Sequence, residues 1–209
     1  MTETIRAPQQ KRSRDSLQRV LVAGAQLFED RGFELLTIQQ VSERSGVSVG
    51  AIYSRFGNKE SLVREIHRHA MRQIHEMNVL LAPGDWTDIP PKELVRETVR
   101  RASELFRVHR DLLRASMHLG AMDEVVSSRG SEGSQQAADA FKSLLVGELD
   151  GKLAHDDPDL AVDLCWRMIY STLARQVMYG PTFESSRMIE WDDLVHELGS
   201  ACTAYLLKD

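Results

Sequence analysis

One short stretch of the chain concentrates side chains that can bind phosphates and the edges of nucleobases. It holds two hydroxyls, a phenol and two cations, on Thr37, Ser48, Tyr53, Arg55 and Lys59. Hydroxyl, phenol and ammonium groups presented near helix starts can converge on phosphates. Between them, Val49 and Ala51 offer apolar contacts to thymine methyl groups. The stretch therefore predicts noncovalent binding of DNA.

Two short helices separated by a glycine would position these groups. Thr37 and Gln40 have the spacing of a capping box, which opens a helix that Gly46 ends. Ser48 can cap the next helix, which ends at Gly57. Such a pair can lay its second helix in the major groove of DNA while its first helix crosses the backbone.

The spacing within the two helices divides core positions from outer ones. The core is expected to receive Val41, Val47, Ile52 and Phe56, which leaves Ser48, Val49, Ala51, Tyr53 and Arg55 on the outside. Gly50 is unexpected inside a helix, where glycine costs about 1 kcal/mol relative to alanine. Its use is close approach of the backbone to another molecule. The alternative is a tight helix crossing inside the protein.

Helical periodicity continues through the remainder of the chain. An apolar face from Leu17 to Phe28 predicts a first helix that Gly32 ends. Further helices are expected at 59–81, 92–109, 111–126, 134–154, 157–179 and 190–207, with a linker at 82–91 and a mobile loop at 127–134. The expected fold is all-α, with a three-helix helix-turn-helix head, a helical body and about nine helices.

Charge separates the start of the chain from the rest. The formal net charge is −5, but residues 1–60 hold nine Lys and Arg against seven Asp and Glu. We expect a basic flexible arm at 1–13 that can enter a minor groove, or alternatively stays a solvated tail. The two cysteines, Cys165 and Cys202, predict neither a zinc site nor a disulfide. A polar N-terminus without a long apolar run indicates a cytoplasmic protein.

The same stretch resembles the DNA-binding head of the TetR family of bacterial transcriptional regulators. The resemblance covers about residues 14–62 and rests on Leu27-Phe28, Gly32-Phe33, Thr37, Val41-Ser42, Gly46-Val47-Ser48, Ile52-Tyr53-Ser54-Arg55-Phe56 and Lys59. It implies that Thr37, Tyr53 and Lys59 contact the DNA backbone. The alternatives are a helix cap for Thr37, core packing for Tyr53 and a solvated charge for Lys59.

Base recognition would then fall to the start of the second short helix. Ser48, Val49, Gly50 and Ala51 are expected nearest the base edges, and their short side chains cannot form bidentate contacts. Arg55 is the only long donor in this helix and could reach a guanine or a phosphate. We therefore expect specificity to depend partly on apolar contacts and on DNA shape.

The resemblance also implies what the body does. Domains are expected at 14–60 for DNA binding and at 61–209 for ligand binding and dimerisation. The dimer interface is expected on the last two long helices, at Leu160, Leu164, Met168, Leu194, Leu198 and Tyr205. A small-molecule pocket is expected at Phe106, His109, Met117, Trp166, Tyr170 and Arg175. All of these residues could instead be plain core, and Arg167 and Arg175, if buried, need an acidic partner or an anionic ligand.

The predicted function is a sequence-specific transcriptional regulator, a repressor released from a palindromic operator by a small-molecule inducer. Its expected partners are double-stranded DNA, a second copy and the effector, with no membrane, cofactor or metal. His67, Met71 and His75 share a helix face, but a solvated, pH-sensitive face is expected there rather than a metal site. The alternatives are a ligand-independent architectural DNA-binding protein or a helical enzyme, although no catalytic motif is present. Repression and activation are not distinguished by the sequence.

Overall fold

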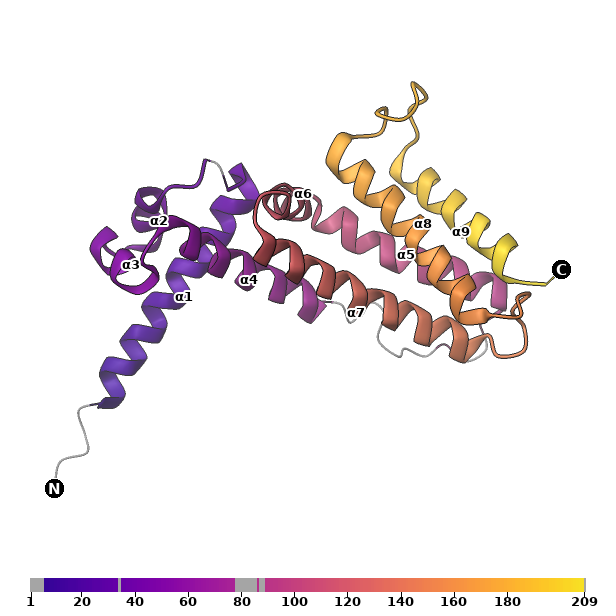
Figure 1. Ribbon diagram of the computed structural model, residues 1–209, viewed down its shortest axis with the longest axis horizontal. Coiled ribbons are helices and arrows are strands. Elements are labelled where there is room, and N and C mark those ends of the chain that lie inside the picture. Colours follow the sequence, from indigo (N-terminus) through magenta and orange to yellow (C-terminus); the bar gives the residue numbers. More distant parts are fainter. Residues whose placement is uncertain (1–5, 34, 78–85, 87–88, 209) are drawn as a thin grey trace. The chain divides into compact units, whose positions relative to one another are not determined.

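The computed structural model describes residues 6–33, 35–77, 86 and 89–208, and these form nine α-helices without a β-strand (Figure 1). The helices are α1 (Arg6–Arg31), α2 (Ile38–Ser45), α3 (Val49–Phe56), α4 (Lys59–Met77), α5 (Pro91–Val108), α6 (Arg110–Gly120), α7 (Glu124–Glu148), α8 (Pro158–Tyr179) and α9 (Trp191–Leu206). The all-α prediction is confirmed. The linker expected at 82–91 lies largely outside the described residues, as do positions 78–81 of the fourth helix.

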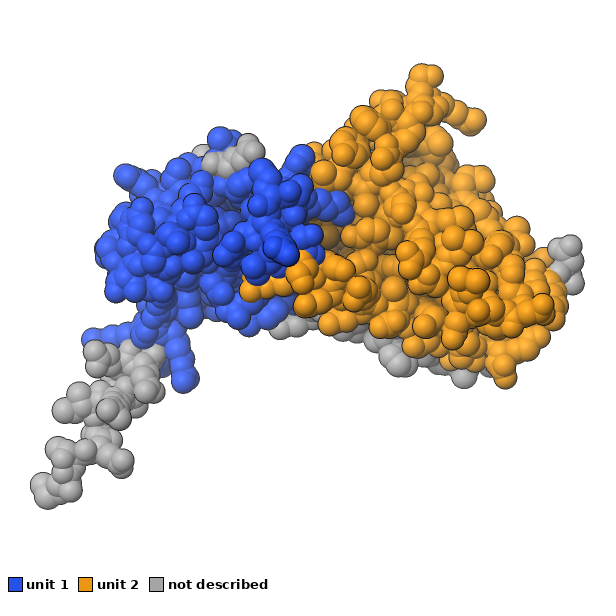
Figure 2. All heavy atoms as spheres, in the orientation of Figure 1, with its two compact units in different colours: residues 1–73, 115–127 blue, residues 74–114, 128–209 orange. Residues whose placement is uncertain are grey.

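The chain divides into two compact units (Figure 2). Unit 1 comprises residues 1–73 and 115–127, and unit 2 comprises residues 74–114 and 128–209. Unit 1 therefore contains the predicted head together with most of α4 and a short later segment. The expected domain boundary at residue 60 stays a prediction.

The core of unit 1 forms where α1 packs with the short helices and with α4. Phe28, Leu36, Val41 and Leu62 are completely buried. Gly24 allows a close approach of α1 to α4, because a Cβ at this position would lie 2.3 Å from Ile66 Cδ1. These contacts hold α2 and α3 on one side of the unit.

Two segments that were expected to be irregular are helical. Residues 6–13 belong to α1 and not to a flexible arm, and Gln9, Gln10, Lys11 and Arg12 are residues that favour helix. Residues 127–134 belong to α7, so the predicted loop there is wrong. Serine and glycine are poor helix formers, but burial along one face of a helix outweighs propensity. That face of α7 carries the buried residues Val126, Ala137, Phe141 and Leu145.

Unit 2 is built from α5, α8 and α9 with most of α7. Its core includes Val99, Phe141, Ile169 and Leu173, all fully buried. The helices α5 and α9 approach closely, since a Cβ on Gly199 would lie 3.5 Å from Arg96 Cα. Cys165 on α8 and Cys202 on α9 are buried free thiols, and their mutual hydrogen bond and burial raise the pKa of Cys165.

Candidate nucleic-acid interface

Local hydrogen bonds define both ends of the two short helices. Thr37 Oγ1 accepts from the backbone N–H of Gln40 at 3.2 Å, and Gln40 Oε1 accepts from the N–H of Thr37 at 3.0 Å. Gly46 ends α2 in the left-handed conformation with φ 66°. Ser48 Oγ accepts from the N–H of Ala51 and thereby caps α3. The capping box, the glycine stop and the serine cap are confirmed.

The helix α3 is buried along one narrow stripe and exposed elsewhere. Ile52 is 1% exposed, while Val47 and Phe56 are half-buried. On the outer side Val49 is 37% exposed and Tyr53 is 50% exposed, and Ser48, Ala51 and Arg55 are exposed as well. The alternative interpretation, in which Tyr53 packs in the core, is therefore wrong. The exposed face has the mixture of apolar, hydroxyl and cationic groups expected of a surface that binds DNA.

Gly50, together with Thr37 before α2 and Lys59 at the start of α4, completes this surface. A Cβ on Gly50 would meet no atom within 4 Å, so a tight crossing inside the protein does not explain the glycine. Thr37 is exposed and Lys59 is half-buried at the first turn of α4. Asn58 caps α4 by accepting from the N–H of Ser61 at 2.8 Å. Contact of these residues with DNA stays a prediction.

Two arginines tie α1 to the short helices. Arg19 Nε on α1 donates to the carbonyl oxygen of Ser45, the last residue of α2, at 3.1 Å. Arg55 on α3 donates from Nη1 to the carbonyl oxygen of Ser13 on α1 at 3.1 Å, and from Nη2 to the Ser13 hydroxyl. The role of Ser13 was not predicted, because no local pattern in the sequence relates two residues so far apart in the chain.

Residues 20–66 match the family model described as "Bacterial regulatory proteins, tetR family". The match begins in α1 and ends within α4, so it includes every exposed residue of the α2–α3 surface. Residues 20–66 are therefore a domain of the TetR family of bacterial regulatory proteins. The helix-turn-helix of that family is thus the element formed by α2 and α3.

Individual relatives agree with this assignment. The chain is 29% identical over 103 residues to the "Uncharacterized HTH-type transcriptional regulator YerO" of Bacillus subtilis (strain 168), covering 46% of this chain and only 33% of that protein. It is 25% identical over 159 residues to the "HTH-type transcriptional repressor KstR2" of Mycolicibacterium smegmatis, covering 73% of each chain. Both names are those of transcriptional regulators and not of enzymes.

The fold agrees over nearly the whole chain. A solved structure of a putative transcriptional regulator from Saccharomonospora viridis in complex with choline superposes with a TM-score of 0.70. It covers 92% of this chain and 97% of that chain, at 16% sequence identity. The two chains therefore share an arrangement of helices that extends beyond residues 20–66.

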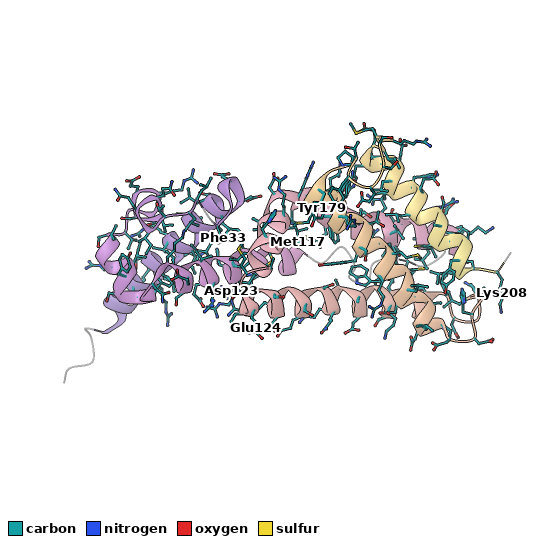
Figure 3. The ribbon with its side chains drawn as sticks, turned by 45° about the horizontal axis from the view of Figure 1, so that its top comes forward. Phe33, Met117, Asp123, Glu124, Tyr179 and Lys208 are labelled. Atoms are coloured by element: carbon teal, nitrogen blue, oxygen red, sulfur yellow. The ribbon has the colours of Figure 1, made fainter. Side chains whose placement is uncertain are left out.

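Three of the predicted pocket residues come together in unit 2. The Tyr170 ring lies 5.5 Å from the Phe106 ring and 6.1 Å from the Trp166 ring, measured between centroids. Phe141, which was not among the predicted pocket residues, has its ring centroid 5.4 Å from that of Trp166. We call Phe106, Phe141, Trp166 and Tyr170 the aromatic cluster. His109 is half-buried in the same unit, and Met117 belongs to unit 1, where it is half-buried (Figure 3).

Arg175 and Arg167 differ from what was expected of them. Arg175 is exposed and pairs with Glu184, and its guanidinium lies over the stacked rings of Tyr179 and Phe183. Arg167 is exposed and pairs with Asp163 one turn earlier at 2.7 Å. Neither arginine is buried, so neither needs an anionic ligand or a partner from a second subunit.

A groove of about 580 Å³ lies between α5 and α9 in unit 2. Its lining is mainly charged, and it consists of Ile89, Glu93, Arg96, Glu97, Arg100, Asp192, Val195, His196 and Gly199. Glu97 accepts from Arg100 at 2.6 and 2.8 Å and from Arg101 at 2.8 Å. The hydrogen bond from Arg100 outweighs burial and lowers the pKa of Glu97 to about 2. None of the predicted pocket residues lines this groove.

The predicted dimer residues expose much of their apolar surface. Leu160, Leu164 and Met168 follow one another at intervals of one helical turn along α8 and are all exposed. On α9, Tyr205 is exposed, and Leu194 and Leu198 are half-buried. A monomer core would have covered these side chains.

The histidine face of α4 is not solvated as expected. His67 is 1% exposed and His69 is 7% exposed, and the His67 ring meets Phe28 edge-on at 6.1 Å. The side chain of His75 lies outside the described residues. Among the side chains that are described, no group of three or more His, Cys, Asp or Glu is arranged to hold a metal ion. Every helix within the described ranges is too short or too polar to cross a membrane.

Proposed function

We propose that the protein is a dimeric repressor that binds a palindromic operator through α3 and leaves it when a small molecule binds to unit 2. The observation that carries this proposal is the exposed face of α3, where Val49, Gly50 and Tyr53 are uncovered while Ile52 anchors the helix. A helix of this kind can enter the major groove with its first residues against the bases. The repressor role is supported by the similarity to KstR2, a repressor by its name.

On the operator, Thr37, Tyr53 and Lys59 bind phosphates and fix the orientation of α3. Ser48, Val49, Gly50 and Ala51 approach the base edges, where Val49 and Ala51 contact thymine methyl groups. Their side chains are too short for bidentate hydrogen bonds, so DNA shape contributes to specificity. A base-substitution scan in which discrimination came from a single guanine alone would contradict this assignment.

The second copy binds through α8 and α9. A symmetric four-helix arrangement would cover Leu160, Leu164 and Met168, which are exposed in the single chain. Two recognition helices then face successive major grooves, about 34 Å apart or a multiple of it. Tyr205, Leu194 and Leu198 belong to the same surface on α9.

The effector binds at the aromatic cluster, with His109 and Arg175 of the same unit as further candidates. Choline is the first probe, because aromatic rings attract quaternary ammonium groups and the similar structure from Saccharomonospora viridis contains choline. Effector binding is coupled to DNA release if the ligand binds more tightly to a dimer conformation in which the spacing of the recognition helices does not match the operator half-sites. Such coupling is typically about 1–3 kcal/mol.

Selection of bound duplexes from a random pool tests the proposal most directly. The full chain is expected to enrich one palindrome. It should also give a single sharp footprint on that duplex, which persists when the protein is diluted about tenfold at constant salt. Uniform coating of any duplex would instead indicate an architectural protein. A pool without enrichment, or an asymmetric consensus, would remove the proposed function.

Variants of the contact residues test the surface itself. Tyr53→Ala and Lys59→Ala should each weaken binding to the selected operator. Met122→Ala is the control, because this side chain is 63% exposed on the segment between α6 and α7 and has no assigned role. Equal affinities for all three variants would show that α3 is not the DNA-binding helix.

A further inference from the structure

The only long donor on the recognition helix is already engaged in the absence of DNA. Arg55 lies in the last turn of α3, and its guanidinium forms two hydrogen bonds to one residue of α1. Ser13 supplies both acceptors, its backbone carbonyl and its hydroxyl. The carbonyl also accepts from the hydroxyl of Ser16 at 2.9 Å. All of these groups belong to unit 1.

Ser13 sits in the middle of a cationic segment. Lys11, Arg12 and Arg14 are exposed, and none of them forms an ion pair within the described part of the chain. We call Lys11, Arg12 and Arg14 the basic turn of α1. The segment lies before residue 20, where the match to the family model begins. Its three positive charges are free to bind phosphates.

The basic turn has little else to hold it in place. The first described side chain of α1 that is buried is Val20, and before it only Ser13, Ser16 and Leu17 are half-buried. A helix end without apolar packing frays, since its own hydrogen bonds are worth little in water. Among the described residues, hydrogen bonds from Arg55 to Ser13 and from Arg19 to Ser45 attach this end to α3 and α2.

We propose that Arg55 is a positioning residue that fixes the basic turn of α1 beside the recognition helix, so that Lys11, Arg12 and Arg14 form a second phosphate-binding surface on the operator. Arg55 then acts through Ser13 and does not recognise a base. Fixing the turn before DNA arrives lowers the entropy lost on binding. This inference rests on the proposed function, because it needs α3 to lie on DNA.

Two substitutions of arginine separate positioning from a simple loss of charge. Arg55→Met removes the hydrogen bonds to Ser13, and Arg44→Met is the matched control. Arg44 is an exposed arginine of the same unit that pairs with Asp30 on α1 at 3.4 Å. Ser13→Ala removes the hydroxyl acceptor only and keeps the charge of Arg55, so it serves as a second, milder variant.

Hydrogen exchange of the DNA-free full chain tests the attachment. Arg55→Met should speed exchange of the backbone amides between residues 13 and 18 by about tenfold, because hydrogen bonds to a charged group are lost. Ser13→Ala should act in the same direction and less strongly, and Arg44→Met should leave these amides unchanged. Unchanged exchange in both Arg55→Met and Ser13→Ala overturns the proposal, whatever happens on DNA.

The salt dependence of operator binding tests the surface. One lost phosphate contact lowers the slope of log K against log salt by about 0.9. Arg55→Met should lower the slope by more than one such contact does, and by the same amount on the operator and on its single-base variants. The triple variant Lys11→Gln, Arg12→Gln, Arg14→Gln should show the same loss. If Arg55→Met lost discrimination at one base pair, Arg55 would be a base-contacting residue. That result would overturn this inference and leave the proposed function standing. Failure of the unaltered chain to bind any duplex would remove the proposed function, while the exchange experiment still decides whether Arg55 fixes α1.

Discussion

Arg64 on α4 forms an ion pair with Asp123 at the start of α7, with Arg64 Nε and Asp123 Oδ2 2.7 Å apart. The other carboxylate oxygen, Oδ1, accepts from the backbone N–H groups of Val125 at 3.0 Å and Val126 at 3.2 Å. Asp123 therefore caps α7 and binds α4 with one carboxylate. Burial raises the pKa of Asp123, but the hydrogen bonds from Arg64 and from these N–H groups outweigh it and lower the pKa below 3.8.

Asp123→Ala should lower the free energy of unfolding by about 1–2 kcal/mol, because it removes a helix cap. Asp123→Asn should cost less, since an amide oxygen can still accept from Val125 and Val126. Urea unfolding at pH 7 measures both. Glu124→Ala is the control, because Glu124 is exposed and adjacent. Equal unfolding midpoints for Asp123→Ala and Glu124→Ala would contradict the role of the cap.

The lowered pKa of Glu97 should make the stability of unit 2 depend on pH. Its folded-state pKa of about 2 lies below the ordinary value of 4.5. The ion-paired carboxylate therefore contributes stability above pH 4.5, and this contribution is lost as the pH falls from 4.5 toward 2. Glu97→Gln should cost about 1 kcal/mol at pH 7, a modest amount because solvent screens the partly exposed ion pair.

The difference between the unaltered chain and Glu97→Gln should shrink between pH 4.5 and 2.5 in urea unfolding. Glu93→Gln removes a charge from an exposed position on the same helix and serves as the control. A Glu97→Gln difference that stayed constant over this range would mean that the ion pair with Arg100 does not stabilise the fold.

Substitution by alanine should have opposite effects on stability at Gly50 and at Gly24. A Cβ on Gly50 meets no atom within 4 Å, so Gly50→Ala should raise the stability of the free protein by up to about 1 kcal/mol. The same variant should weaken operator binding at least about tenfold if the backbone of α3 approaches DNA closely. Thermal unfolding and operator titration measure the two effects, and unchanged affinity would place Gly50 away from DNA.

Gly24→Ala is the matched comparison. A Cβ here would lie 2.3 Å from Ile66 Cδ1 and 2.5 Å from Ile66 Cγ1, so Ile66 must move. The cost of overpacking, typically about 1–3 kcal/mol, should exceed the gain in helix propensity. Net destabilisation is therefore expected at Gly24, in contrast to Gly50. A Gly24→Ala protein as stable as the unaltered one would indicate that the Ile66 side chain can move aside at no cost.

The exposed stripe of α8 predicts that a charge there separates the two copies. Leu164→Glu should convert a dimer to a monomer in sedimentation equilibrium, because the carboxylate would be buried without a partner. The fold should survive, since Leu164 is 41% exposed in the single chain. Met122→Glu, at another exposed apolar position, should leave the dimer intact. If Leu164→Glu stayed dimeric, the interface would lie elsewhere.

The two short helices were predictable because their signals are local. The capping box of Thr37 and Gln40, the stop at Gly46 and the cap at Ser48 each act over three or four residues, and all three were found where expected. The loop predicted at 127–134 failed for the opposite reason. Its serines and glycines disfavour helix locally, but packing of Phe141 and Leu145 further along α7 decides its structure.

The sequence by itself determined the helix-turn-helix, its resemblance to the TetR family and the exposed residue types of α3, because backbone hydrogen bonding and helical periodicity depend on neighbours within a few residues. Only the tertiary structure decided that Arg55 bonds to Ser13, that Arg175 pairs with Glu184 and that His67 is buried. These relationships join residues on different elements. Their formation depends on how whole helices pack, which no local spacing specifies.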